Sequence, residues 1–258
     1  MEKANRSQFI ESKFSESDHK IFWTEGFKSP SRIITKSGNI ALATDKALRE
    51  SNEDVLLLDI DHDAFAVVDG MGGYEKGGVA AKILAEAIKD DFKKPDANPS
   101  DLMCQAFLRM HEEGIHQGGA AYLAGRIEDN GKKLSIYQAG DCGLIITDKY
   151  GKIKFSSKPN GLDVAPSGKS PGQPEISKGI KLENYDCIIA ATDGLWDNAL
   201  AEEVAQIAAN KKIENALQQL AELAKKGMKG NRGDGSFGNP DNITALIYQI
   251  LPVPLRGK

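Results

Sequence analysis

The chain has 258 residues, with 33 Lys and Arg against 37 Asp and Glu, so its net charge is −4. This mild acidity argues against a general nucleic-acid binder, which needs a basic face. The proportions of hydrophobic (40%) and charged (27%) residues argue against wholesale disorder. Apolar runs are far shorter than the roughly 20 residues that cross a bilayer. We therefore expect a globular protein with no nucleic-acid partner and no membrane partner.

Two further features bear on where the protein works. The first residues, Met-Glu-Lys-Ala-Asn-Arg-Ser-Gln, have no apolar stretch of the kind that a signal peptide carries. The three cysteines, Cys104, Cys142 and Cys187, are odd in number and widely spaced, which fits a reduced compartment better than a disulfide framework. Both features predict a cytoplasmic protein.

Residues 1–30 are polar and weakly periodic. They predict either an extra strand that joins the main sheet or an arm outside the fold, and the pattern does not decide between the two. We expect residues 31–258 to form a single domain.

The first clear elements follow this segment. Residues 55–60 and 64–68 are apolar runs separated by Asp61-His62-Asp63, which predicts a hairpin. A helical period then begins and predicts a helix over 78–92, ended by Lys93-Lys94-Pro95. Ser100 is the expected N-cap of a second helix.

The second half alternates strands with a second pair of helices. Residues 156–180 hold several Pro and Gly and predict an irregular surface excursion. The other expected elements are strands at 134–139, 144–147, 152–155, 187–191 and 243–251 and helices at 200–209 and 213–227. Helices in pairs between runs of strands indicate an α+β fold.

Acidic residues stand at the ends of five predicted strands. Asp69, Asp141 and Asp193 each follow an apolar run, Asp241 precedes the last one, and Glu53-Asp54 precede the first. Such acids often only meet solvent. If the strand ends converge, however, their mutual repulsion requires cations. Mg²⁺ and Mn²⁺ prefer oxygen ligands, and a pair of such ions can hold a phosphate ester and activate water.

Five short motifs in this order resemble the metal-dependent protein phosphatases of the 2C type, in their compact bacterial form. They span about residues 35–251 and read Arg49-Glu50-Ser51-Asn52-Glu53-Asp54, Val68-Asp69-Gly70-Met71-Gly72-Gly73, Ala139-Gly140-Asp141, Ala191-Thr192-Asp193-Gly194-Leu195-Trp196-Asp197 and Pro240-Asp241-Asn242-Ile243-Thr244. The resemblance implies a four-layer α-β-β-α sandwich, in which two antiparallel sheets are flanked by pairs of helices and the metals lie at one end.

The resemblance also implies a role for each matching position. Asp69 would bridge two Mn²⁺ or Mg²⁺ ions, with the Gly70 carbonyl on the second. The first ion would be held by Asp193 and Asp241. The second would be served by Glu53 and Asp54, partly through water.

Three more positions complete the implied site. Asp141, together with Asp193, would support a third, weaker metal site. Arg49 would clamp the substrate phosphate, although its spacing from Glu53 also fits an ordinary surface ion pair. Asn242 would orient Asp241 or cap a turn.

Some positions depart from the family's usual pattern. Met71 stands where some members have a His that is assigned as general acid, so the proton donor to the leaving group is unassigned. Cys142-Gly143 stand where Ser-Arg is usual. We expect Cys142 to point into the sandwich, because adjacent strand residues face opposite ways. The histidines His19, His62, His111 and His116 are read as surface or capping residues.

The implied function is a serine/threonine protein phosphatase that hydrolyses phosphoserine and phosphothreonine by direct attack of metal-bound hydroxide. Its partners would be phosphorylated proteins, and the chain is expected to be a monomer. Two alternatives stay open: a catalytically silent binding module with this fold, and a metal-dependent hydrolase of a small phosphate ester.

Overall fold

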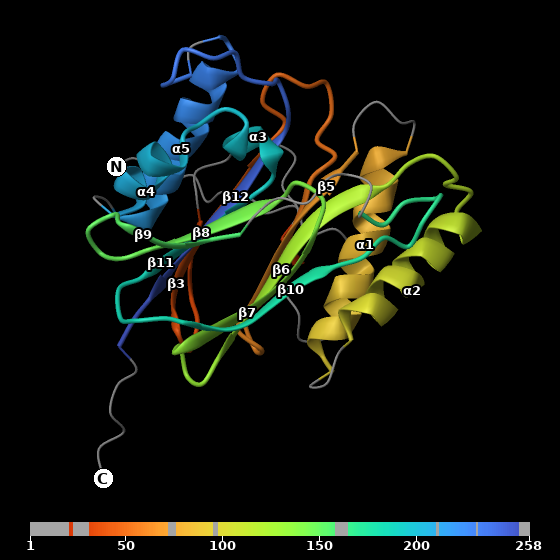
Figure 1. Ribbon diagram of the computed structural model, residues 1–258, viewed down its shortest axis with the longest axis horizontal. Coiled ribbons are helices and arrows are strands. Elements are labelled where there is room, and N and C mark those ends of the chain that lie inside the picture. Colours follow the sequence, from red (N-terminus) through yellow and green to blue (C-terminus); the bar gives the residue numbers. More distant parts are fainter. Residues whose placement is uncertain are drawn as a thin grey trace, which may run out of the picture.

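The computed structural model describes residues 21–22, 31–71, 76–94, 98–157, 165–209, 212–230 and 232–252. Two six-stranded antiparallel sheets stack face to face, and helices cover the outer face of each (Figure 1). This arrangement confirms the predicted α-β-β-α sandwich.

The first sheet contains the predicted hairpin. Its strand order is β1-β4-β5-β6-β7-β10, and Val55 of β4 lies opposite Val68 of β5. The strands are β1 (Ile21–Phe22), β4 (Val55–Asp59), β5 (Ala64–Gly70), β6 (Ala120–Glu128), β7 (Lys133–Ala139) and β10 (Glu175–Lys181). The two residues of β1 pair with β4, so the N-terminal segment contributes at least a short strand; the other residues of 1–30 lie outside the described ranges.

The second sheet has the order β2-β3-β12-β11-β8-β9. Its strands are β2 (Ser31–Ile34), β3 (Gly38–Asp45), β8 (Gly143–Thr147), β9 (Ile153–Ser156), β11 (Cys187–Ala191) and β12 (Ile243–Ile250). In the middle of this sheet β12 lies between β3 and β11, so the last strand of the chain is paired on both sides.

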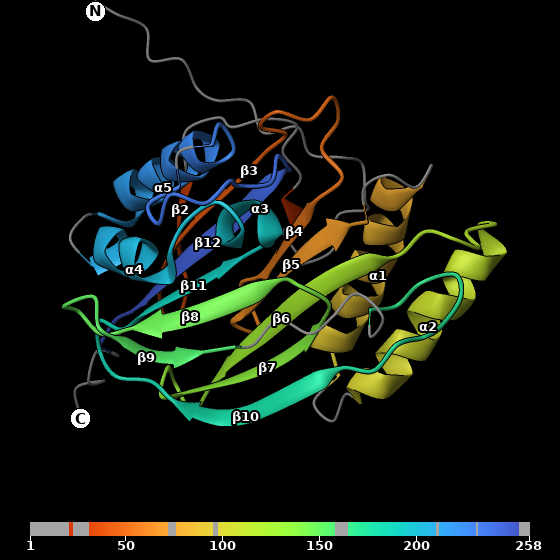
Figure 2. The same ribbon diagram turned by 45° about the horizontal axis from the view of Figure 1, so that its top comes forward.

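The helices lie in two groups, one outside each sheet (Figures 1 and 2). The first group is α1 (Gly77–Phe92) and α2 (Pro99–Glu112), and the second is α3 (Asp193–Trp196), α4 (Ala201–Ala209) and α5 (Ile213–Gly227). Three apolar cores result: one beneath α1 and α2, one between the sheets, and one beneath α3 to α5. No helix in the described part of the chain is both long and apolar enough to cross a membrane.

Two predictions about local structure are wrong. Ser100 does not cap α2: the side chain of Asn98 accepts a hydrogen bond from the Ser100 backbone N–H at 3.2 Å, and Pro99 is the first helical residue. This order fits helix chemistry, because Asn is a strong N-cap and Pro is tolerated at the first position.

The excursion at 156–180 is not irregular throughout, since β10 occupies its last part. This edge strand is mostly exposed, and its register shifts between Ser177 and Ile180, beside Gly179 with φ of +68°. An exposed strand with such an irregularity has no apolar alternation, which is the signal that predicts strands.

Candidate metal centre

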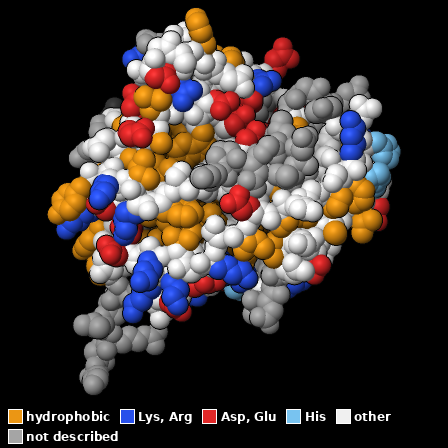
Figure 3. Space-filling view, in the orientation of Figure 1, with side chains coloured by type: hydrophobic (Ala, Val, Ile, Leu, Met, Phe, Trp, Pro, Cys, Tyr) orange, Lys and Arg blue, Asp and Glu red, His pale blue; other side chains and the backbone are white. Residues whose placement is uncertain are grey.

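Acidic side chains from four strand ends and one turn meet at one end of the sandwich. The charges of Asp54, Asp141 and Asp193 raise the pKa of Asp69, and those of Asp141 and Asp241 raise the pKa of Asp193. Figure 3 shows acidic side chains gathered on this face, between α3 and the end of β5. The predicted convergence of Asp54, Asp69, Asp141, Asp193 and Asp241 is therefore observed.

Asp69 and Asp193 form the centre of this cluster, joined by a hydrogen bond between their side chains. Burial, followed by the charges of Asp54 and Asp193, raises the pKa of Asp69 well above its usual value. Burial also raises the pKa of Asp193 to about 7. Both carboxylates are half-buried, and two carboxylates in contact repel each other when both are charged, which adds to desolvation in raising the pKa of Asp69. The other oxygen of Asp193, Oδ1, is buried and has no hydrogen-bond partner.

Asp54 is held from the second sheet. Its Oδ2 accepts a hydrogen bond from the Thr192 hydroxyl at 3.0 Å, and Thr192 Oγ1 in turn accepts the Thr244 backbone N–H at 3.1 Å. Burial still raises the pKa of Asp54 to about 7, against the lowering effect of its hydroxyl partners. Thr192 therefore links the start of β4 to β11 and β12 and positions this carboxylate.

Asn242 fastens the loop before β4 to the start of β12. Its Nδ2 donates to the carbonyls of Lys46 (3.1 Å) and Ser51 (2.8 Å), and its Oδ1 accepts the Glu53 backbone N–H at 2.8 Å. Its own N–H also donates to Asp241 Oδ1 at 2.7 Å. These four bonds support the interpretation that Asn242 orients its neighbours.

Arg49 lies on that loop and reaches the cluster. Its guanidinium donates from Nε to the Pro240 carbonyl at 2.9 Å and from one terminal nitrogen to Asp241 Oδ2 at 2.7 Å. The Arg49 side chain is 40% exposed and that of Asp241 is 20% exposed. The ion-pair partner of Arg49 is thus Asp241 and not Glu53. This contact places Arg49, the residue predicted to bind the substrate phosphate, next to the carboxylates.

Asp141 lies at the rim of the cluster. Burial raises its pKa, and the charges of Asp197 and Asp241 act in the same direction. Asp141 comes from the turn between β7 and β8, so it belongs to the same end of the sandwich as the other acids. The structure therefore brings five of the predicted acids together. Glu53 is joined to the site through its backbone N–H, while its Oε2 lies beside Gly77 at the start of α1.

The glycines after Asp69 and Asp193 are required by backbone packing. A Cβ on Gly70 would lie 2.6 Å from the Gly77 carbonyl, and one on Gly194 would lie 1.7 Å from the Asn242 carbonyl oxygen. Glycine at these two positions therefore permits a close approach of two chain segments. Gly72 and Gly73 of the same motif lie outside the described residues.

One positioning residue, Asn198, has no signal in the sequence beyond its place after Asp197. It is 1% exposed, and its Nδ2 donates to the carbonyls of Gly194 (3.0 Å) and Asn239 (2.7 Å). Gly194 follows Asp193, and Asn239 precedes Asp241 by two residues. Asn198 therefore ties together the two segments that carry these acids.

The histidines are separate features. His62 contacts Asp59 Oδ2 at 2.8 Å through Nδ1, and the rings of His111 and His116 face each other with centroids 5.1 Å apart. All three are exposed, in agreement with the surface interpretation. His19 lies outside the described residues.

The carboxylates are engaged with one another and with nearby donors. Within the described ranges, no three Asp, Glu, His or Cys side chains already form a metal-binding group. Asp241 turns to Arg49, Asp54 turns to Thr192, and Asp69 contacts Asp193.

The chemistry of the cluster fits a hard divalent cation. All its ligands are oxygens, which suits Mg²⁺ and Mn²⁺. The unpartnered Asp193 Oδ1 and the raised pKa values of Asp54, Asp69 and Asp193 both indicate uncompensated negative charge, which a cation would balance.

Fold and cluster together define a class: a two-sheet α+β sandwich with an acidic cation-type site at one end. Among solved structures, the photosystem II phosphatase PBCP matches with a TM-score of 0.67 and 22% identity, covering 82% of this chain and 98% of that one. The catalytic domain of the serine/threonine protein phosphatase PstP, solved with two manganese ions, matches with a TM-score of 0.63 and 19% identity, covering 83% of this chain and 98% of that one.

Comparison of the sequence with known proteins finds relatives of this chain among the protein phosphatases. "Protein phosphatase PTC7 homolog fig" of Drosophila grimshawi is 23% identical over 232 residues, which cover 73% of this chain and 75% of that protein. "Probable protein phosphatase 2C 71" of Oryza sativa subsp. japonica is 27% identical over 235 residues, covering 84% of this chain but only 49% of that longer protein. No family model matches the chain. The relatives and the fold confirm the resemblance drawn from the five motifs: the chain is similar to protein phosphatases of the 2C type in sequence and in fold.

Proposed function

We propose that this chain is a metal-dependent serine/threonine protein phosphatase. The observation that carries the proposal is the contact between the half-buried carboxylates of Asp69 and Asp193, which lie among further carboxylates at the end of the sandwich. Carboxylates so close together are costly without a compensating charge. The same cluster is the natural place for the two Mn²⁺ or Mg²⁺ ions that the family resemblance implies.

The proposed ligand sets follow the matching motifs. Asp69 and the Gly70 carbonyl would hold the two ions together with Asp193 and Asp241 on the first and with Glu53 and Asp54, partly through water, on the second. Asp141 with Asp193 would hold a third ion more weakly. When bound, such ions neutralise the charge of a phosphate ester and lower the pKa of water.

Arg49 is the proposed phosphate ligand. Its planar fork suits a phosphate, and it now donates to Asp241 and the Pro240 carbonyl. Cation binding would engage Asp241 and leave the terminal nitrogens of Arg49 for the substrate. The ion pair therefore couples the loading of the cation site to the availability of the phosphate clamp.

The residues around the acids keep them in place. Thr192 holds Asp54, while Asn242 and Asn198 hold the chain segments that carry Glu53, Asp193 and Asp241. The leaving-group proton is not assigned to position 71, since Met71 has no proton to give. The monomeric state and the cytoplasmic location stay predictions from the sequence.

The test is release of phosphate from a phosphothreonine peptide with Mn²⁺, compared with a chelator control and with small phosphate esters at matched concentration. We expect Mn²⁺-dependent hydrolysis with a higher kcat/KM on the peptide, and its loss in Asp193→Asn. Hydrolysis of small esters alone would support the alternative hydrolase. No hydrolysis with intact Mn²⁺ binding would support the silent binding module.

A further inference from the structure

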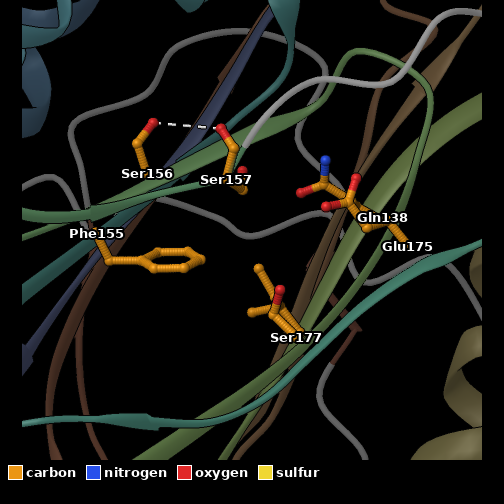
Figure 4. A pocket seen from close by; sticks show the side chains of 7 residues that line it. Gln138, Phe155, Ser156, Ser157, Glu175 and Ser177 are labelled. Atoms are coloured by element: carbon orange, nitrogen blue, oxygen red, sulfur yellow. Dashed lines mark hydrogen bonds between the residues drawn. The ribbon is translucent and has the colours of Figure 1, made fainter.

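A cavity of about 260 Å³ opens between the two sheets at the edge formed by β9 and β10 (Figure 4). Phe155 lines one side of it, Gln138 and Glu175 line the opposite side, and Ser177 lies below (Figure 4). Elsewhere, large apolar side chains fill the space between the two sheets, so this cavity is a local gap in the packed core.

The cavity lies toward the end of the sheets at which the turn with Asp141 is found. Gln138 stands three residues before Asp141 at the end of β7. On the other wall, the Ser157 backbone N–H donates to the Leu144 carbonyl at 2.9 Å, and Ser157 Oγ accepts the Leu144 N–H at 2.9 Å. Leu144 stands three residues after Asp141. The two walls therefore belong to the strands next to the Asp141 turn, so the cavity opens toward the end of the sandwich that carries the acids.

The cavity lining combines apolar side chains with hydrogen-bond acceptors. Ile136 is 1% exposed, and Phe155 packs against the core between the sheets. In the β7–β10 register Glu175 lies opposite Gln138 and Ser177 opposite Ile136, so these four side chains share the face that looks toward β9. Hydroxyl and amide oxygens of Ser157, Ser177 and Gln138 add acceptors around the wall.

The charge of the lining has one sign. Among the described residues that line the cavity, Glu175 has the one charged side chain, and it is exposed at the mouth. The nearest lysine along β9, Lys154, is engaged elsewhere: its ammonium contacts Asp186 at 2.7 Å and Glu183 at 3.2 Å. Lys154 therefore does not neutralise the carboxylate of Glu175.

We propose that this cavity receives a lysine or arginine side chain of the phosphorylated protein substrate, so that the enzyme prefers phosphorylation sites with a basic residue nearby. The inference rests on the proposed function and names a substrate class for it. The aliphatic part of such a side chain lies along Phe155 and Ile136, and its cationic end meets Glu175 and the hydroxyl oxygens. Long basic side chains bind in this manner, with an apolar stem and a solvated head.

The experiment uses phosphothreonine peptides of alanine and glycine, and a set in which a single Arg replaces Ala at each position on either side of the phosphothreonine. For the native chain we expect one or two positions to raise kcat/KM about 2- to 5-fold, the range of a partly exposed ion pair. Higher salt should reduce this gain, because exposed charges are screened.

Two variants make the test specific. Glu175→Gln should lose the preference for Arg while keeping the rate on the peptide without Arg. Glu183→Gln makes the same charge change on the neighbouring loop, outside the cavity lining, and should keep the preference. The peptide without Arg reports the proposed function independently of Glu175.

Three results would overturn the inference. The native chain could hydrolyse all peptides equally, Glu175→Gln could keep the preference, or Glu183→Gln could abolish it to the same extent; each would remove Glu175 from substrate choice while leaving the phosphatase itself intact. Hydrolysis of no peptide at all would contradict the proposed function together with this inference.

Discussion

Buried carboxylates stand at both ends of the sandwich, and their surroundings differ. At one end of β5, Asp63 accepts hydrogen bonds from the Ser37 hydroxyl at 2.7 Å and the Tyr248 hydroxyl at 3.0 Å. At the other end of the same strand, Asp69 faces Asp193, Asp54 and Asp141. Hydrogen-bond donors therefore contact both carboxylate oxygens of Asp63 at one end of the strand. At the other end, the neighbours of Asp69 are further carboxylates.

The difference separates a structural acid from a functional one. The bonds of Asp63 join the β4–β5 turn to β3 and β12 and so hold the two sheets together, which compensates for burial of its charge. Asp69 and Asp193 have each other and further carboxylates as neighbours, so the charged forms of both are disfavoured and their pKa values are raised. Low exposure of a carboxylate therefore does not by itself indicate a cation site. Acidic neighbours in place of hydrogen-bond donors do.

The first way to test this comparison is to remove one acid from each end. Asp193→Asn should reduce kcat at least about 100-fold, since even a partner of a metal ligand contributes 10- to 100-fold. The free energy of unfolding of the metal-free variant should stay the same or rise, because a repelling charge is gone. Phosphate release and urea denaturation measure the two effects.

Asp63→Asn is the matched control at the other end. It should lower the free energy of unfolding by about 1.5–3 kcal/mol, the value of a hydrogen bond to a charged group, and leave kcat/KM of the folded fraction unchanged. If Asp63→Asn abolished activity and Asp193→Asn did not, the assignment of the two ends would be reversed.

Arg49 is the proposed link between the acidic end and the substrate phosphate. Arg49→Ala should reduce kcat/KM about 10- to 100-fold, chiefly through a higher KM, because a bidentate charge-assisted contact is worth roughly 1.5–3 kcal/mol. Arg49→Lys is the control, which keeps the charge without the fork and should recover only part of the loss. An unchanged kcat/KM in Arg49→Ala would reduce Arg49 to an ion pair with Asp241.

The pH dependence of stability is a third test of the acidic end. Asp54 and Asp193 have a pKa of about 7 in the folded chain against an ordinary value of 3.8, so between these values the folded state holds protons that the unfolded state has lost. Stability linked to them is therefore highest at low pH and falls as the pH rises from about 4 to about 7.

In a chelating buffer we accordingly expect a lower Tm at pH 8 than at pH 5.5, measured by differential scanning fluorimetry. Mn²⁺ should raise the Tm at pH 8 more than at pH 5.5, because protons compete with the cation. Asp193→Asn should show a smaller fall with pH. A metal-free Tm that rises from pH 5.5 to pH 8 in both proteins would contradict the assigned pKa directions.

The smallest effect is expected at Cys142. It is fully buried between the sheets, and burial, together with the charge of Asp69, raises the pKa of its thiol. Such a thiol is inert. Cys142→Ser should leave Mn²⁺-dependent activity largely intact and lower the free energy of unfolding by about 1–3 kcal/mol.

Cys104 provides the internal control, since it is exposed on α2. A thiol reagent should modify Cys104 rapidly and Cys142 slowly in the native chain. Rapid modification of Cys142 that abolishes activity, with protection by Mn²⁺, would instead identify a redox switch beside the acids.

The sequence predicts much of the acidic site because acidic residues that border apolar runs are recognisable in the sequence. Asp69, Asp193 and Asp241 each border an apolar run, and strands of an antiparallel sandwich bring alternate ends together. The helices α1, α4 and α5 follow from their 3.6-residue period. The burial of Cys142 follows from strand alternation after Asp141, and the structure confirms it.

Other features leave no such trace. Nearly all residues of β3 and β6 are buried on both faces, so no alternation predicts these strands. The edge strand β10 is exposed and interrupted at Gly179. The contacts of Asn198 and Arg49 depend on tertiary packing that joins segments about 40 and 190 residues apart, which no local pattern contains.

The central claim is that the acidic end of the sandwich binds divalent cations, and isothermal titration with Mn²⁺ tests it most directly. The native chain at pH 7.5 should bind two ions, with protons released in proportion to the raised pKa values of the acids. Asp193→Asn should lose binding, while Asp63→Asn should bind as the native chain does. Absence of Mn²⁺ binding to the folded native chain, or equal binding by Asp193→Asn, would contradict the account.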